Sequence, residues 1–80
     1  MEIIKNKVYK HFKGDLYLVV DIAEHTETGE QMVIYRALYG ECKLYARPLT
    51  MFASKIDIQR AKKYNQEYRF TLADIETKNK

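Results

Sequence analysis

Two groups of side chains in this 80-residue sequence have the residue types needed for ligand chemistry. Histidine and carboxylate residues gather in the stretch 25–30, which reads HTETGE. These residue types bind metals and transfer protons. Arginine and tyrosine recur along the stretch 35–47, and together they can stack on bases and bind phosphates or carboxylates. The first group suits a metal or acid–base centre, and the second suits a binding surface.

A metal or acid–base centre would be built on His11, His25 and Glu27, with Glu24 as a further ligand. No HExxH spacing fixes two of these ligands on one helical face. The stretch 23–30 is also polar and contains Gly29, as a hairpin loop does. We therefore favour a loop role for His25 and a half-buried His11 that donates to a carbonyl, and we expect no metal or cofactor. A small metal-dependent or acid–base enzyme is the alternative function.

Nucleophilic catalysis is not expected from this sequence. Cys42 is the sole thiol and Ser54 the sole serine, and neither lies in a nucleophile elbow. The three glycines lie far apart, so no glycine-rich loop can surround a phosphate. We assign no catalytic residue.

A binding surface is the leading hypothesis, with nucleic acid as the first ligand and a protein partner as the second. Its arginines and tyrosines would lie on neighbouring strands of a central hairpin. The alternative is that the tyrosines fill the core while the arginines pair with carboxylates. The predicted ligand-binding residues are Arg36, Arg47, Tyr39, Tyr45, His25, Glu27 and His11.

A second, basic patch lies in the C-terminal part of the sequence and is interleaved with tyrosines. Residues 51–80 hold the whole net charge of +3, because residues 1–50 balance seven basic against seven acidic side chains. Such a patch can bind nucleic acid, although a solvated helix face is the alternative. Its predicted nucleic-acid-binding residues are Arg60, Lys62, Lys63 and Arg69.

The composition predicts one small domain over residues 1–75, followed by a frayed polar tail at 76–80. The sequence is 46% apolar and 31% charged, and it has no apolar run long enough to span a membrane. One cysteine cannot form an intramolecular disulfide. We expect a cytoplasmic protein, as a monomer or weak homodimer.

The elements that must position these residues are mostly short strands. Strands are predicted at 8–12, 16–22, 32–39, 44–47 and 68–72. In the third, Val33, Tyr35, Ala37 and Tyr39 alternate and are expected to face the core, which leaves Arg36 outside. A helical turn follows Pro48 at 49–53, and a brief strand is expected at 56–58. The stretch 59–64 has a helix-compatible composition but is too short to be a stable helix alone. The predicted fold is mainly β, a five-stranded SH3-like barrel or a rolled antiparallel sheet with one short helical turn.

Several fragments in this order resemble the bacterial family known as domain of unknown function 1653. The fragments are YKHFKG at 9–14, HTET at 25–28, YRALYG at 35–40, RPL at 47–49, MF at 51–52 and RF at 69–70. The segment 59–66 is longer than the usual turn of that family. The resemblance implies a small β-rich domain of bacteria and their phages with no assigned activity.

Overall fold

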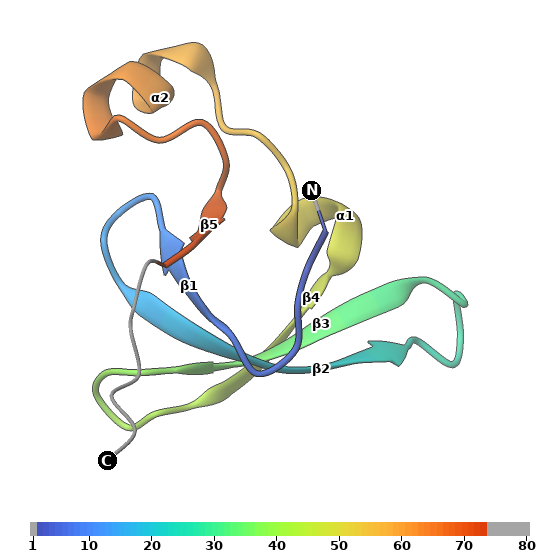
Figure 1. Ribbon diagram of the computed structural model, residues 1–80. Coiled ribbons are helices and arrows are strands. Elements are labelled where there is room, and N and C mark those ends of the chain that lie inside the picture. Colours follow the sequence, from blue (N-terminus) through green and yellow to red (C-terminus); the bar gives the residue numbers. More distant parts are fainter. Residues whose placement is uncertain (1, 74–80) are drawn as a thin grey trace.

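The computed structural model describes residues 2–73 and shows one antiparallel five-stranded sheet with two short helices (Figure 1). The elements are β1 (Val8–His11), β2 (Leu16–Glu24), β3 (Gln31–Ala37), β4 (Leu44–Pro48), α1 (Leu49–Phe52), α2 (Ile58–Tyr64) and β5 (Phe70–Leu72). The strand order is β4-β3-β2-β1-β5, so β4 and β5 are the two edges. The sheet curls but does not close (Figure 1). The rolled sheet is therefore confirmed, and the closed barrel is not.

The inner face of the curled sheet carries the core. Directly opposed residues of antiparallel strands point to the same face. The pairs Tyr9–Tyr17, Val19–Tyr35 and Tyr35–Tyr45 therefore place all five side chains on that face. The buried residues of the core cluster are Ile3, Tyr9, Val19, Val33, Tyr35, Phe52 and Phe70.

A register shift in β2 explains how Val19 and Ile22, three positions apart, both face the core. The pairing of β2 with β3 shifts between Val19 and Asp21, which marks a bulge around Val20. Val19 is buried on the inner face before the shift, and Ile22 packs against the core after it. The bulge therefore reverses the alternation of inner and outer residues within one strand.

The alternation predicted for β3 is confirmed for three of its four residues. Val33, Tyr35 and Ala37 are buried, whereas Tyr39 is 41% exposed. Tyr39 lies beyond the end of β3 at Ala37, and the prediction that it is a core residue is therefore wrong. Arg36 is exposed, as expected.

The predicted helical turn after Pro48 is confirmed as α1, but the chain has a second helix, α2. The carboxylate of Asp57 accepts a hydrogen bond from the backbone N–H of Arg60 at 3.1 Å and so caps the start of α2. Ile58 is 72% exposed in the first turn of this helix instead of lying in a strand. Asp57 is thus a helix cap, and the expected strand at 56–58 is wrong.

Neither α1 nor α2, the helices of the described residues, has the length and hydropathy needed to cross a membrane. The predicted domain limit at residue 75 and the predicted frayed tail at 76–80 fall outside the described residues.

Aromatic rings connect α1 to strands on both sides of the curled sheet. Phe52 of α1 stacks on Phe70 of β5 with a centroid distance of 3.9 Å and an interplanar angle of 3°. The Phe52 ring also meets Tyr9 and Tyr35 edge to face, at 5.7 and 5.2 Å. Phe52 therefore joins β1, β3 and β5 across the inside of the open sheet.

Replacing Phe52 with alanine should destabilise the fold severely. Phe52 has no exposed surface, so Phe52→Ala should lower the free energy of unfolding by about 3–5 kcal/mol, measured by urea denaturation. Met51, its neighbour in α1, is 50% exposed, and Met51→Ala should change the free energy by less than about 0.5 kcal/mol. Equal effects of the two substitutions would contradict the assignment of Phe52 as the central core residue.

Candidate functional site

A partly exposed cluster of tyrosine, arginine and histidine side chains lies on the inner side of the sheet. Buried Tyr35 and Phe70 form its floor, since their rings contact several of its members. We call this cluster the Tyr–Arg face. Its residues are His11, Tyr17, Tyr39, Tyr45, Arg47 and Arg69.

More buried tyrosines support the two exposed tyrosines of this face. The hydroxyl groups of Tyr17 and Tyr39 are hydrogen bonded at 2.6 Å, and their rings meet edge to face at 5.5 Å. Burial, followed by the hydrogen bond to Tyr39, raises the pKa of Tyr17, which therefore stays a neutral phenol. Tyr45 packs beside Tyr35 with ring centroids 5.7 Å apart. Both exposed rings are therefore held in place while one side of each remains accessible.

The two arginines of this face have unused hydrogen-bond donors. The guanidinium carbon of Arg47 lies 5.6 Å from the centroid of the Phe70 ring. Arg69 donates from Nε to the hydroxyl of Ser54 at 3.2 Å. Within residues 2–73, neither arginine forms an ion pair with a carboxylate. Both guanidinium groups therefore have N–H groups available for an anion.

His11 lies beside these arginines and is half-buried. Its Nδ1 accepts a hydrogen bond from the backbone N–H of Lys13 at 3.2 Å, so the neutral ring carries its proton on Nε2. Burial lowers the pKa of His11, and the positive charges of Arg47, Arg69 and Lys13 lower it further. The half-buried position agrees with the sequence interpretation, but the backbone bond is accepted from Lys13 and not donated to a carbonyl. Nε2 offers a neutral donor beside two cations.

The residues predicted for the alternative enzyme do not come together. His11 lies near the start of β2, whereas His25 follows its end, at the tip of the β2–β3 hairpin (Figure 1). Nδ1 of His25 accepts a hydrogen bond from the backbone N–H of Glu27 at 3.1 Å, as in the predicted loop role. Within the described part of the chain, no three His, Cys, Asp or Glu side chains cluster to hold a metal.

Arg36 is separated from the rest of the predicted binding surface by the sheet. It pairs with Leu18 and Leu44 on the outer face, and its guanidinium donates to the carbonyl of Cys42 at 2.9 Å. Arg47 instead pairs with Val33, which is buried on the inner face. The structure therefore brings Arg47, Tyr39, Tyr45 and His11 together, but it does not bring Arg36, His25 or Glu27 to them.

The second predicted patch is divided between α2 and the Tyr–Arg face. The guanidinium of Arg60 lies 5.8 Å from the centroid of the Phe12 ring, and its Nε lies 3.5 Å from a carboxylate oxygen of Asp57. Lys62 and Lys63 are exposed in the last turn of α2, where cations interact favourably with the helix dipole. Arg69 belongs to the Tyr–Arg face, because it precedes Phe70 and its carbonyl accepts a hydrogen bond from the backbone N–H of Phe12, next to His11.

Sequence reasoning missed Tyr17 as a member of the site. A signal was available, since Tyr17 follows the turn after His11 and alternates with buried Val19. The hydrogen bond between Tyr17 and Tyr39 could not be predicted from the sequence, because it depends on where β3 ends.

Comparison with known proteins now assigns the chain to a family. The family model described as "Protein of unknown function (DUF1653)" matches residues 7–72. The chain belongs to the DUF1653 family. The crystal structure of a family member from the bacterium Bordetella bronchiseptica is similar, with 28% sequence identity, a TM-score of 0.72 and 95% of each chain covered. No protein with a curated description matches the sequence. The resemblance inferred from the sequence fragments is thus confirmed.

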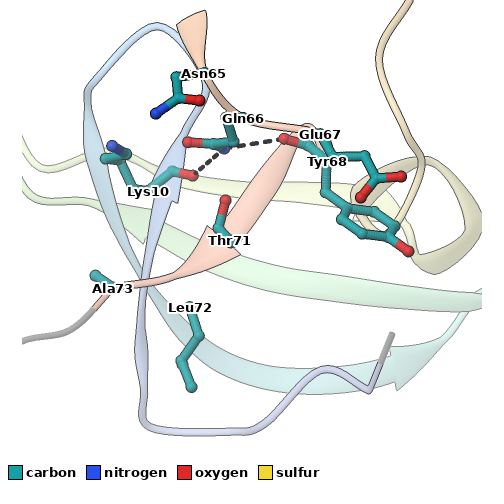
Figure 2. A pocket seen from close by; sticks show the side chains of 8 residues that line it. All are labelled: Lys10, Asn65, Gln66, Glu67, Tyr68, Thr71, Leu72 and Ala73. Carbon is teal, nitrogen blue, oxygen red and sulfur yellow. Dashed lines mark hydrogen bonds between the residues drawn. The ribbon is translucent and has the colours of Figure 1, made fainter. Parts of the chain in front are cut away.

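A groove in this DUF1653 protein lies outside the Tyr–Arg face, where the α2–β5 connection meets β1 (Figure 2). Its volume is about 460 Å³. The side-chain amide of Gln66 crosses it, donating to the carbonyls of Lys10 at 3.1 Å and Tyr68 at 2.9 Å (Figure 2). The hydroxyl of Thr71 is buried there and has no hydrogen-bond partner among residues 2–73. The groove lacks the grouped cations and exposed rings of the Tyr–Arg face, and Gln66 has a structural role in it.

Gln66→Ala should therefore weaken the attachment of the α2–β5 connection to β1. The substitution removes two side-chain hydrogen bonds to carbonyls, and we expect the free energy of unfolding to fall by about 1–2 kcal/mol in urea denaturation. Gln59→Ala on exposed α2 is the matched control and should have little effect. A loss of stability no larger than that of the control would contradict the structural role of Gln66.

The pKa of His11 should lie below 6.5 and should depend on Arg47. In an NMR pH titration, Arg47→Ala should raise this pKa because a nearby positive charge is removed, although burial should keep it below 6.5. Lys62→Ala should leave it unchanged. A wild-type pKa of 6.5 or above, or no response to Arg47→Ala, would contradict this description.

The lowered pKa of His11 also makes the free energy of unfolding depend on pH. Since the unfolded chain binds the His11 proton more tightly than the folded chain, the contribution of His11 to stability is fully present above pH 6.5. It is lost as the pH falls from 6.5 to the lower pKa of the folded state. Urea denaturation across this window should therefore show stability rising with pH.

Proposed function

We propose that this protein is a non-catalytic binding module and that its Tyr–Arg face takes single-stranded nucleic acid. The observation that supports the proposal is the position of two partly exposed tyrosines beside two arginines that lack carboxylate partners within residues 2–73. Tyr39 and Tyr45 offer ring surfaces, and Arg47 and Arg69 offer N–H donors. Stacking and phosphate binding are thus available on one face.

Single strands suit this face better than a duplex. Unpaired bases can leave the strand and stack on aromatic side chains, which contributes about 1–3 kcal/mol per base. The arginines would bind the adjacent phosphates through charge-assisted hydrogen bonds. Neutral His11 would add a donor without adding a third charge that must be desolvated.

The modest charge of the face sets the expected salt dependence. Contacts with two or three phosphates would give a slope of about −1.4 to −2.1 for log affinity against log salt concentration. Binding should therefore be weak but measurable at low salt. A cytoplasmic location belongs to this proposal, since nucleic acid is available there and the exposed thiol of Cys42 is compatible with a reducing compartment.

A protein partner is the second candidate, because the same arginines can bind a carboxylate. The edge strand β4 also borders the face and can pair with an extended peptide. Such a partner would insert apolar side chains and would give a shallower salt dependence than nucleic acid.

The test is the binding of labelled octanucleotides, single-stranded RNA and DNA, measured by fluorescence anisotropy at several salt concentrations. Arg47→Ala should weaken binding by about tenfold, since a charge-assisted hydrogen bond is lost. Lys62→Ala removes the same charge from α2 and should weaken binding by less than about twofold.

Two outcomes would contradict the proposal. If neither RNA nor DNA binds at low salt, the face does not take nucleic acid. If Lys62→Ala weakens binding while Arg47→Ala does not, the cations of α2 and not the Tyr–Arg face contact the strand.

A further inference from the structure

A small hollow lies at the end of the β3–β4 hairpin, beside the two exposed tyrosines. Its volume is about 220 Å³, and it is lined by Ala37, Tyr39, Gly40, Glu41, Lys43 and Tyr45. This volume is too small for an extended peptide with several side chains and is suited to one planar heterocycle.

The walls of the hollow favour an aromatic ligand. Tyr39 and Tyr45 are 41% and 40% exposed, and each contacts a more buried tyrosine, Tyr17 and Tyr35 respectively. Ala37, which also lines the hollow, is buried and has a side chain of one methyl group. A flat ring that enters the hollow therefore meets aromatic surface without displacing a large side chain.

The rim of the hollow carries a hydrogen-bond acceptor beside a donor. The carboxylate of Glu41 lies 4.0 Å from the ammonium group of Lys43, and both side chains are largely exposed. The carboxylate has two acceptor oxygens, and the ammonium group has three donors. At this separation both groups can reach the edge of one base.

Guanine matches this pattern better than the other bases. Its Watson–Crick edge places two adjacent donors, N1–H and N2–H, beside one acceptor, O6. A carboxylate can accept from both donors at once, while the ammonium group donates to O6. Adenine and cytosine each offer one amino group, and uracil offers one imino N–H, so none of them can fill both carboxylate oxygens.

Building on the nucleic-acid binding proposed above, we propose that this hollow is a base pocket selective for guanine, in which Glu41 and Lys43 recognise the Watson–Crick edge. Arg47 lies two residues beyond Tyr45 on the same face of β4, about 7 Å along the strand. This position is suited to the phosphate that is joined to the bound nucleotide.

The test compares hexauridylates that carry guanosine, adenosine, cytidine or inosine at one central position, so that no guanine quadruplex forms. The guanosine strand should bind about tenfold more tightly than the adenosine and cytidine strands. Inosine, which lacks N2–H, should lose most of this preference. Amide NMR shifts should include Glu41 and Lys43 only for the guanosine strand.

Glu41→Gln tests the residue itself. A carboxamide has only one acceptor oxygen, so the guanosine preference should disappear while the affinity for hexauridylate itself stays the same or rises slightly. Glu67→Gln is the matched control, because Glu67 is an exposed carboxylate that pairs with Lys55 away from the hollow. It should retain the preference.

The outcomes separate this inference from the proposed function. Equal affinity for all four strands, with NMR shifts on the Tyr–Arg face, would overturn guanine selection and leave nucleic-acid binding intact. A guanosine preference that survives in Glu41→Gln would overturn the role of Glu41. Absence of binding by every strand would overturn the proposed function and the base pocket with it.

Discussion

The stack of Phe52 on Phe70 is the contact on which both the core and the candidate site depend. Phe52 belongs to α1 and Phe70 to edge strand β5, so their contact links the two edges of the open sheet. Backbone hydrogen bonds between residues 54–56 and 67–69 hold the same two sides together. Phe70 also contacts Tyr17 and His11, and it lies beneath the guanidinium of Arg47. Phe70 is thus part of the core and also lies directly beneath the residues of the Tyr–Arg face.

This arrangement gives the site its electrostatic character. Arg47 and Arg69 lie close enough to His11 to lower its pKa, and no carboxylate of residues 2–73 forms an ion pair with either of them. Positive charges held near one another repel, and a bound anion would relieve that repulsion. Asp15 offsets only part of the effect on His11. The face therefore concentrates positive charge locally even though the net charge of the chain is only +3, and the nucleic-acid binding proposed above relies on this.

The sequence predicted the strands well because their alternation is local, but it could not predict which arginine shares a face with the tyrosines. The face on which each arginine lies depends on the strand register. Arg47 pairs with Val33 on the inner face, whereas Arg36 pairs with Leu44 on the outer face. The bulge around Val20 and the end of β3 at Ala37 also depend on tertiary context. By contrast, the Asp57 cap of α2 was readable from the sequence, because aspartate is a preferred first residue before a helix.

The two exposed tyrosines can be ordered without being buried, and this property matters for binding. Edge-to-face and tilted contacts with Tyr17 and Tyr35 restrict Tyr39 and Tyr45 before any ligand arrives. Less conformational entropy is then lost when a ligand ring packs against them. Tyrosine suits this purpose because it provides a large contact area with few rotatable bonds. A domain of this size already fills its core with Tyr9, Tyr35, Phe52 and Phe70. Rings held at the surface in addition to these are therefore available to the ligand proposed above.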